Sequence, residues 1–142
     1  MTYCRIDLSK TNYTIRDNWV YLYAMDLYPK LHQIYKQYCE YKQFDSVMPL
    51  FDNQFYDPLA DIVGYYHNNN LVAFSLIKTY DSQNAEALQF AWDYADPELR
   101  LGIESLKNEC AIYKERGFKY LYLGSADEYK SHIDGYEILG KL

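Results

Sequence analysis

The segment Ala85–Gly124, AEALQFAWDYADPELRLGIESLKNECAIYKERGFKYLYLG, decides the fold. It contains a strand-like stretch (Glu86–Tyr94), a break at Asp96-Pro97, an amphipathic helix that stops at Gly117, and a second strand-like stretch (Phe118–Gly124). A strand that returns through a helix to a second strand of the same sheet forms a βαβ unit. Such sheets place ligands at the strand ends, next to the helix N-terminus. We therefore predict an α/β fold with a ligand site near the start of this helix.

The central helix has the clearest pattern in the chain. Its apolar residues recur at steps of four, three, four and three, which places them on one helical face. They are Leu99, Ile103, Leu106, Cys110 and Tyr113. Asp96 is predicted to cap the helix, because its side chain can accept a backbone hydrogen bond, and Pro97 suits the first helical position. Gly117 is predicted to end the helix.

Three strands are predicted to form an antiparallel meander before the central helix. Asp61–His67 and Leu71–Lys78 flank the asparagines Asn68–Asn70. Asparagine tolerates the positive φ that tight hairpin turns require, so this is the best hairpin candidate in the chain. The third strand of the meander is Glu86–Tyr94, which is also the first strand of the βαβ unit.

The remaining segments complete the predicted order. Short strands are expected at Tyr3–Leu8 and Tyr136–Leu139, and two helical stretches are expected around Pro29, which should end or kink the first of them. Their apolar stripes are Trp19, Leu22, Tyr23 and Met25 in the first, and Leu31, Ile34, Tyr35, Tyr38 and Tyr41 in the second. Phe51–Pro58 is expected to be a loop, and Ser125–Asp134 a loop or short helix. One sheet with helices on both faces satisfies every apolar stripe.

Length and charge restrict the class of protein. The chain has 142 residues and a net charge of −6, and its length predicts a single domain over residues 1–142. A duplex-binding protein normally carries a basic patch, but the sequence has no basic run, so DNA is excluded as a partner and tRNA is disfavoured. No run approaches the ~18–20 apolar residues that span a bilayer, so no membrane partner is expected.

Cysteine and histidine usage gives no sign of a disulfide framework or a metal site. The cysteines are Cys4, Cys39 and Cys110, and the histidines are His32, His67 and His132. The cysteines are odd in number and widely spaced, which favours reduced thiols and a cytoplasmic location. The histidines are too dispersed to suggest metal ligands. The N-terminus lacks the basic-then-apolar pattern of a secretory signal.

The order of elements and two short segments resemble the GNAT superfamily of N-acyltransferases. Arg100-Leu101-Gly102-Ile103 is similar to a reduced form of the family's acyl-carrier loop, Arg/Gln-x-x-Gly-x-Gly/Ala, and Lys114–Leu123 is similar to the way these proteins leave the central helix. Within the superfamily, Tyr94–Pro97, Leu101-Gly102 and Tyr120–Gly124 look closest to the arginyl- and leucyl-tRNA–protein transferases. The resemblance implies a GNAT-like mixed sheet of the α/β (α+β) class.

The resemblance also implies a site for acetyl-CoA or another acyl-CoA as co-substrate. The implied donor-site residues are Trp92, Tyr94, Arg100, Leu101, Gly102 and Ile103. A pyrophosphate would bind at the helix start, where backbone N–H groups and the helix dipole favour anions. A surface arginine, a packing glycine and core aromatic residues are the alternative interpretations of these positions. The helix start is also acidic, since Asp96, Glu98 and Glu104 surround Arg100.

Acyl transfer to an amine requires a proton acceptor for the amine and a proton donor for the leaving group. The resemblance implies Tyr129 as the proton donor. Asp93 or Glu86 is the expected general base, a role in which burial would have to raise the pKa of the carboxyl group.

Three hypotheses about function follow. The leading one is a GNAT-like N-acyltransferase that moves an acyl group from a CoA thioester to an amine, on a small molecule or a protein N-terminus. The second is aminoacyl transfer from aminoacyl-tRNA. The third is a binding module that keeps the scaffold without catalysis, which the acidic helix start and the short Ser125–Asp134 segment motivate.

Overall fold

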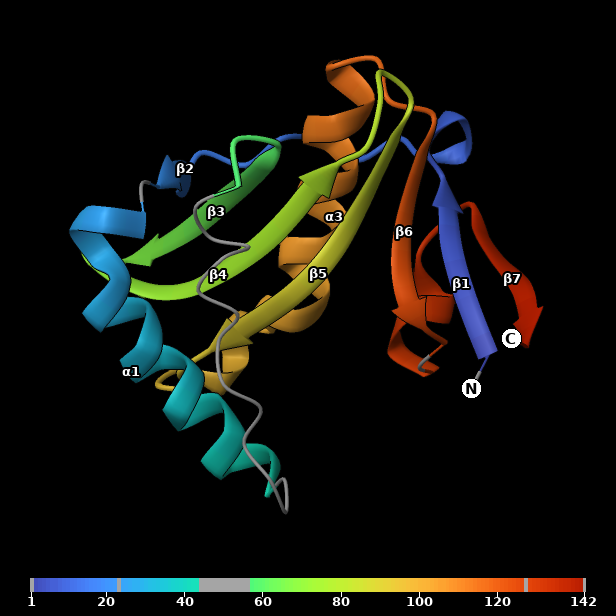
Figure 1. Ribbon diagram of the computed structural model, residues 1–142. Helices are drawn as coiled ribbons and strands as arrows, with labels where there is room; N and C mark the ends of the chain where they lie inside the picture. Colours follow the sequence, from blue (N-terminus) through green and yellow to red (C-terminus); the bar gives the residue numbers. More distant parts are fainter. Residues whose placement is uncertain (1, 23, 44–56, 127, 142) are drawn as a thin grey trace.

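The computed structural model describes residues 2–22, 24–43, 57–126 and 128–141. They form one seven-stranded sheet with the order β2-β3-β4-β5-β6-β1-β7 (Figure 1). The strands are β1 (Thr2–Asp7), β2 (Trp19–Leu22), β3 (Ala60–His67), β4 (Asn70–Thr79), β5 (Asn84–Trp92), β6 (Tyr120–Ser125) and β7 (Tyr136–Lys141). The helices are α1 (Ala24–Lys42) and α3 (Leu101–Glu115), with short 3-10 helices at Leu8–Lys10, Pro97–Leu99 and Glu128–His132.

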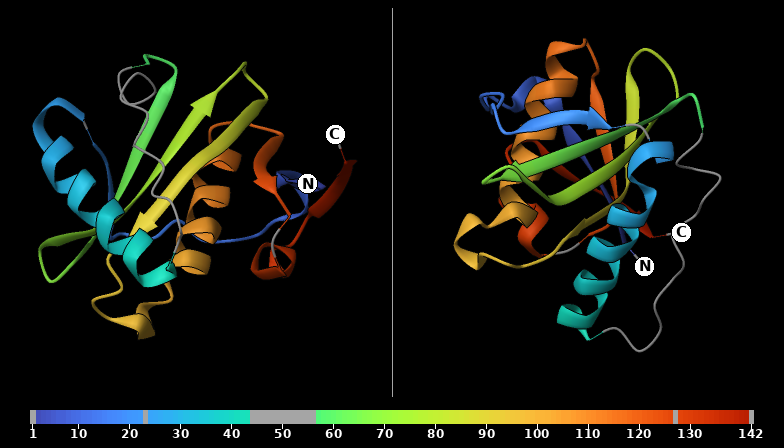
Figure 2. Two further views of the ribbon diagram at one scale, coloured as in Figure 1. Left: turned by 60° about the horizontal axis from the view of Figure 1, so that its bottom comes forward. Right: turned by 90° about the vertical axis from the view of Figure 1, so that its left-hand side faces the viewer.

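The two helices cover opposite faces of the sheet, as Figure 2 shows. Successive strand residues point to opposite faces, so the strands supply two separate cores. On one face, Ile34 of α1 packs in a buried cluster with Phe74 of β4. On the other, Cys110 of α3 packs in a second cluster with Tyr65 of β3. The prediction of one sheet with helices on both faces is confirmed.

The predicted βαβ unit and the antiparallel meander of β3, β4 and β5 are both confirmed. α3 joins β5 to β6, which are parallel, while the other neighbouring strands of the described sheet are antiparallel. The parallel register consists of Asn84 with Tyr120, Ala85 with Leu121 and Glu86 with Tyr122. Beyond these pairs the two strands diverge (Figure 1).

β5 contains a bulge shortly after it loses its pairing with β6. In the ladder with β4, Ile77 pairs with Ala87 and Leu76 pairs with Gln89, so Leu88 is an extra residue. A bulge bends its strand and leaves backbone groups outside the ladder. The disruption of β5 therefore coincides with the divergence of the two parallel strands.

The start of α3 differs from the prediction. Asp96 accepts a hydrogen bond from the Glu98 backbone N–H and caps the 3-10 helix Pro97–Leu99 instead of α3. Arg100 then adopts a left-handed conformation (φ 48°), and α3 begins at Leu101. The predicted helix is thus broken at Arg100, because the chain turns between the two helical segments.

The helix predicted around Trp19 and Leu22 is wrong, because Trp19–Leu22 is strand β2. β2 pairs antiparallel with β3, from Trp19 opposite Tyr65 to Leu22 opposite Ile62. The spacing of Trp19 and Leu22 suits a helix, but a four-residue segment is too short for periodicity to decide against pairing with a sheet edge.

Pro29 was expected to end or kink a helix, yet it lies inside α1, which continues through it to Lys42.

The other predicted segments fall close to observed elements. The strands expected at Tyr3–Leu8 and Tyr136–Leu139 are β1 and β7, and Ser125–Asp134 contains the 3-10 helix Glu128–His132. Most of the loop expected at Phe51–Pro58 lies outside the described residues. All three cysteines are buried, and none of them forms a disulfide. None of the described helices is long and apolar enough to cross a membrane.

Candidate functional site

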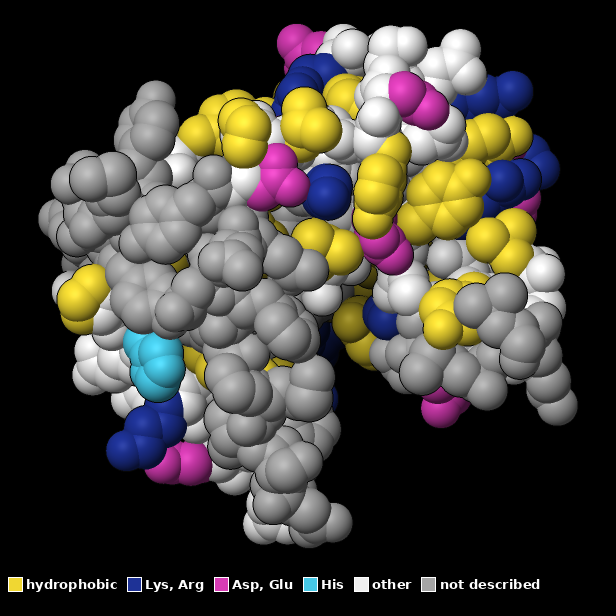
Figure 3. All heavy atoms as spheres, viewed as in Figure 1, with side chains coloured by type: hydrophobic (Ala, Val, Ile, Leu, Met, Phe, Trp, Pro, Cys, Tyr) yellow, Lys and Arg dark blue, Asp and Glu magenta, His cyan; other side chains and the backbone are white. Residues whose placement is uncertain are grey.

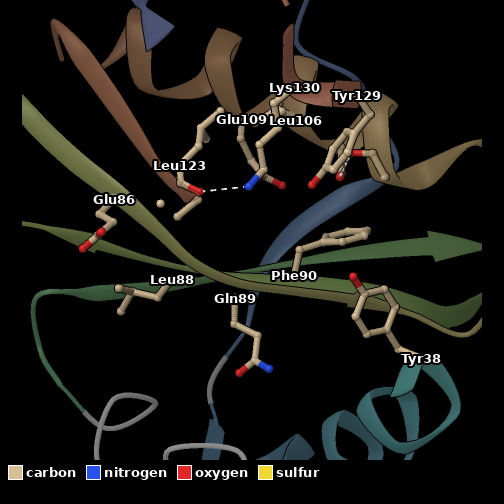
Figure 4. Close-up of a pocket in the computed structure, with 14 residues that line it drawn as sticks. Tyr38, Glu86, Leu88, Gln89, Phe90, Leu106, Glu109, Leu123, Tyr129 and Lys130 are labelled. Carbon is tan, nitrogen blue, oxygen red and sulfur yellow. Dashed lines mark hydrogen bonds between the residues drawn. The ribbon is translucent and has the colours of Figure 1, made fainter. Parts of the chain in front are cut away.

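A cavity of about 340 Å³ lies where β5 and β6 diverge (Figure 4). We call it the inter-strand cavity. Its walls are β5 residues 86–90, the first three turns of α3, the end of β6 and the 3-10 helix Glu128–His132. In Figure 4, Leu106, Glu109, Tyr129 and Lys130 lie on one side of β5, which carries Leu88 and Phe90. Lys130 donates a hydrogen bond from Nζ to the Leu123 carbonyl oxygen at 3.0 Å, which ties the 3-10 helix to β6.

A buried carboxylate lines this cavity. Glu109 of α3 is 3% exposed, and its Oε2 atom accepts hydrogen bonds from the Tyr65 hydroxyl (2.7 Å) and the Ser75 hydroxyl (2.7 Å). Burial raises the pKa of Glu109 to about 7, because it disfavours the charged form, while the two hydrogen bonds act in the opposite direction. Glu109 therefore exchanges a proton near neutral pH, as a general base must.

Tyr65 holds Glu109 within a larger polar network. The Tyr65 hydroxyl accepts a hydrogen bond from Asn108 Nδ2 (3.2 Å) and also lies 3.1 Å from the Ser105 carbonyl oxygen. Asn108 in turn accepts a hydrogen bond from the backbone N–H of Arg16 (2.8 Å). Burial raises the pKa of Tyr65 well above its usual value, so this hydroxyl keeps its proton and remains a donor. The network fixes the carboxylate from β3, β4 and α3.

The sequence interpretation did not select Glu109. Leu106, Glu109 and Tyr113 are separated by three and four residues, so they share one face of α3. The apolar stripe predicted from the sequence runs through Cys110, the neighbour of Glu109, and does not include the carboxylate. The sequence does contain one signal for Glu109, which is a charged residue on the apolar face of the helix. A carboxylate is almost never fully buried without partners, so this position indicates a buried polar network.

A second cavity, of about 290 Å³, lies at the start of α3, and we call it the helix-start cavity. Five of the six predicted donor-site residues line it: Trp92, Tyr94, Arg100, Gly102 and Ile103. The sixth, Leu101, is buried in the core on the α3 face. The two cavities share Tyr38, Phe90, Gly102 and Tyr129 as lining residues, so they adjoin.

Aromatic rings form one wall of the helix-start cavity. The Tyr94 ring centroid lies 3.7 Å from that of Tyr41 and 4.2 Å from that of Trp92. Tyr94 and Tyr38 are stacked at 6.0 Å, and Lys42 Nζ lies 6.0 Å from the Tyr94 ring centroid. Trp92 is also a core residue, 4% exposed, so it serves both the core and the cavity wall. The cluster joins the end of β5 to α1.

Gly102 is not required by close packing. Apart from its chain neighbours and the backbone of its own helix, a Cβ atom added at this position would meet no atom of the described structure within 4 Å. The interpretation of Gly102 as a packing glycine therefore has no support in the described residues. Its small size instead keeps the wall shared by the two cavities open.

Two of the three predicted catalytic residues line the inter-strand cavity, and the third does not. Tyr129 lines both cavities, and Glu86 lines the inter-strand cavity. Glu86 accepts a hydrogen bond from the Tyr80 hydroxyl (2.6 Å), which raises the pKa of Tyr80 to about 12. Asp93 lies in the turn after β5, where its Oδ1 accepts the Ala95 N–H, and it lines neither cavity. The structure brings Tyr129 and Glu86 to one cavity with Glu109 and leaves Asp93 outside it.

The acidic surroundings of the helix start are partly neutralised. Glu104 pairs with Arg16 at 2.8 Å and lies 3.8 Å from Lys107. An anion at the start of α3 would therefore meet less net negative charge than the sequence suggests.

The structure is similar to solved acetyltransferases and to the C-terminal domain of a protein described as a lysylphosphatidylglycerol synthetase. No protein-family model and no curated protein sequence matches the chain. An aminoglycoside acetyltransferase from an uncultured soil metagenomic sample superposes with a TM-score of 0.56 at 16% identity, over 80% of each chain. A GCN5-related N-acetyltransferase from Kribbella flavida gives a TM-score of 0.59 at 12% identity, over 96% of this chain and 53% of its own.

The C-terminal DUF2156 domain of a protein described as a lysylphosphatidylglycerol synthetase, from Agrobacterium fabrum, gives a TM-score of 0.63 at 13% identity. The match covers 88% of this chain and 46% of the solved one, so the present chain spans about half the length of that structure. These identities are low, and the similarity is therefore one of fold. The chain has a GNAT-like α/β fold, with its two cavities beside the diverging parallel strands.

Proposed function

We propose that this protein is an N-acyltransferase that moves an acyl group from a CoA thioester to an amine. The observation that carries the proposal is the inter-strand cavity, which lies between two diverging parallel strands and adjoins a second cavity at the start of α3. A thioester needs an extended slot for its arm and an anion site for its phosphates. The two adjoining cavities offer both.

The start of α3 suits the phosphates of the donor. Ile103 and Glu104 are the first residues whose N–H groups bond back to the Arg100 carbonyl, so the N–H groups of Leu101 and Gly102 precede the helical ladder. Arg100 makes no side-chain cap of this helix end. Unpaired N–H groups and the helix dipole attract a pyrophosphate, and the open space at Gly102 lets it approach the backbone.

The strand divergence suits the acyl group. Beyond Glu86, the edge of β5 that faces β6 has no strand partner in the described sheet, and Leu88 bulges from the ladder with β4. Backbone N–H groups on such an edge need an acceptor, and a thioester carbonyl oxygen lying there would provide one. The same donors would stabilise the oxyanion that forms when the amine attacks.

Tyr129 is suited to protonate the leaving thiolate. It lies at the junction of the two cavities, since it lines both. A phenol there would be near the thioester sulfur if the phosphates bind at the helix start and the acyl group reaches the inter-strand cavity. The bond from the acyl carbon to sulfur breaks in this step, and the thiolate takes the proton.

Mass spectrometry tests the proposal directly. The protein is incubated with acetyl-CoA and a panel of amines that includes aminoglycosides, polyamines and peptides with free N-termini. CoA release and a product heavier by one acetyl group are the expected result. Gly102→Asp, which adds bulk and negative charge between the cavities, should abolish both signals. If the wild-type protein releases no CoA and acetylates no amine of the panel, the proposal is contradicted.

An aminoacyl donor is the second candidate, because the fold also matches the domain described as part of a lysylphosphatidylglycerol synthetase. An aminoacyl ester presents the same type of carbonyl to the amine, so the inter-strand cavity suits it equally. The net charge of −6 does not favour a tRNA donor. Replacing acetyl-CoA by aminoacyl-tRNA in the assay separates the two donors. Turnover with neither donor, without CoA binding, would favour a binding module.

A further inference from the structure

We infer that Glu109 is the proton acceptor for the amine in the inter-strand cavity, a role that neither Glu86 nor Asp93 fills. The inference rests on the proposed acyl transfer and assigns a catalytic residue to it. It also defines the acceptor, which would arrive as an ammonium ion and lose a proton before it attacks.

The hydrogen bonds on Glu109 define which of its oxygens is reactive. The hydroxyls of Tyr65 and Ser75 both donate to Oε2, at 2.7 Å each. These two donors occupy the acceptor positions of Oε2, so a proton from the amine would go to Oε1. The arrangement also holds the carboxylate in a single orientation, because its donors come from two different strands of the sheet.

The surroundings of Glu109 suit a base that works near neutral pH. Its titratable and charged neighbours are Tyr65 on β3, Cys110 on α3, and Tyr38, Glu86, Tyr129 and Lys130 on the other walls of the cavity. Tyr65 stays neutral, and burial together with the Glu109 charge raises the pKa of the Cys110 thiol, so both remain protonated. With a pKa of about 7, Glu109 is ionised in about half of the molecules at neutral pH.

The two bases expected from the sequence are less suitable. Glu86 already accepts a 2.6 Å hydrogen bond from Tyr80 and is partly exposed to solvent. Asp93 bonds the Ala95 N–H and lies outside the inter-strand cavity. Glu109 combines deep burial with a position on the cavity wall. A buried carboxylate is the stronger base, because burial favours its protonated form.

The proton balance of the reaction is complete without another reagent. The Glu109 carboxylate removes one proton from the ammonium ion and leaves a neutral amine. The amine nitrogen attacks the thioester carbonyl carbon, a C–N bond forms and the C–S bond breaks. The leaving thiolate gains a proton from Tyr129, and the second proton that the nitrogen loses as the amide forms reprotonates Tyr129. Glu109 returns its proton to solvent.

Glu109→Gln is the decisive variant, with Glu115→Gln as its matched control. The glutamine oxygen can still accept from Tyr65 and Ser75, but the side chain cannot take up a proton. Glu115 is an exposed residue at the last position of the same helix. Acetyl transfer to the best amine of the panel is measured from pH 5.5 to 9.5, together with CoA affinity by calorimetry.

The expected result is a 10²- to 10⁴-fold loss of kcat/KM for the amine at pH 7 in Glu109→Gln, with unchanged CoA affinity. In the wild type, kcat/KM for the amine should rise with pH with an apparent pKa near 7, and Glu109→Gln should not show this rise. A weakly basic acceptor such as aniline, already neutral at pH 7, should recover most of the lost rate. Glu115→Gln should match the wild type throughout.

Tyr65→Phe provides a second variant that does not remove the carboxylate. It deletes one hydrogen bond to the charged form of Glu109, so the rising limb should move to higher pH. A wild-type pH profile in both Glu109→Gln and Tyr65→Phe, with acetyl transfer intact, would overturn the assignment of Glu109 alone. Absence of CoA binding and of acetyl transfer in the wild-type protein would overturn the proposed function, and the assignment with it.

Discussion

The hydroxyl oxygen of Tyr65 lies 2.7 Å from Oε2 of Glu109, which joins the α3 face of β3 to the wall of the inter-strand cavity. Both groups are almost inaccessible to solvent, and Ser75 shares the same carboxylate oxygen at 2.7 Å. A carboxylate in this position costs stability when it is charged. A buried carboxyl group beside a cavity, with a pKa raised by burial, is typical of a functional site.

The first prediction concerns stability as a function of pH. Glu109 has a pKa of about 7 in the folded protein, above its ordinary value of 4.5. Between these two pH values the folded state keeps a proton that the unfolded chain has lost, so the free energy of unfolding falls as the pH rises from 4.5 to 7. The shift corresponds to about 3 kcal/mol in total. Above pH 7 this contribution is constant.

Glu109→Gln should remove this part of the pH dependence. Urea unfolding at pH 5 and pH 8 measures it, with Glu115→Gln as the control. The wild type and the control should lose stability between the two pH values, and Glu109→Gln should lose about 2–3 kcal/mol less. Equal pH dependence in all three proteins would show that Glu109 is not buried as described.

A second prediction tests the start of α3 by an alanine substitution at Gly102, with a substitution after the end of the helix for comparison. Gly102→Ala should raise the free energy of unfolding by up to about 1 kcal/mol, because its Cβ meets no atom within 4 Å and alanine favours helix. Gly117→Ala is the matched comparison, and it should lower stability by about 1 kcal/mol because Gly117 has a φ of +95°. Thermal unfolding measures both. If Gly102→Ala lowers the free energy of unfolding, the space around Gly102 is more crowded than the structure shows.

A third prediction tests strand β2. A Cβ atom at Gly64 would lie 2.4 Å from Leu22 Cδ1, so Gly64→Ala should cost about 1–3 kcal/mol through the steric conflict with Leu22. Combined with Leu22→Ala, the substitution should cost less than the sum of the two single changes, because the conflict disappears. Chemical denaturation of both single variants and the double variant measures the coupling. Strict additivity would mean that Leu22 does not lie over Gly64.

A fourth prediction concerns the attachment of α3 to β3. The buried Tyr113 hydroxyl donates to Asp61 Oδ2 at 2.7 Å, and Arg116 binds the same oxygen at 2.6 Å. Asp61→Ala leaves the Tyr113 hydroxyl without its acceptor and should cost about 1–3 kcal/mol. Asp17→Ala, at an exposed aspartate, should change stability by less than about 0.5 kcal/mol. Similar small effects in both variants would contradict the role of Asp61.

The sequence was sufficient to predict the elements whose pattern is long. The stripe from Ile103 to Tyr113 spans three turns, so no competing pattern fits it, and α3 contains the whole of it although the helix begins later than predicted. The hairpin of β3 and β4 was equally clear, because alternating residues flank an asparagine turn. The parallel pairing of β5 and β6 then follows from the helix that connects them.

Short or isolated signals were the ones that failed. Trp19–Leu22 is four residues long, and only its pairing with β3 makes it a strand. The left-handed turn at Arg100 depends on the path of the chain between two helical segments, which local preference does not reveal. Glu109 resembles a solvent-facing residue until Tyr65 and Ser75, more than 30 positions away in the chain, supply its partners.

Tyrosine rings on the surface of the sheet beside the site pack against charged groups of the same chain. Hydrophobic and charged side chains intermingle over β6 and β1 (Figure 3). There the Arg5 guanidinium lies 3.8 Å from the Tyr120 ring centroid and 3.0 Å from Glu137. These rings already pack against a cation of the same chain. They therefore give no reason to expect nucleic-acid bases in their place.

A crystal structure with bound acetyl-CoA would test the central claim most directly. The account predicts the pyrophosphate at the N–H groups of Leu101 and Gly102, with the thioester arm between β5 and β6 and its carbonyl group beside the Leu88 bulge. The acetyl group would then lie in the cavity that Glu109 lines. CoA bound at another surface, or β5 and β6 closed together with no ligand between them at saturating acetyl-CoA, would contradict it.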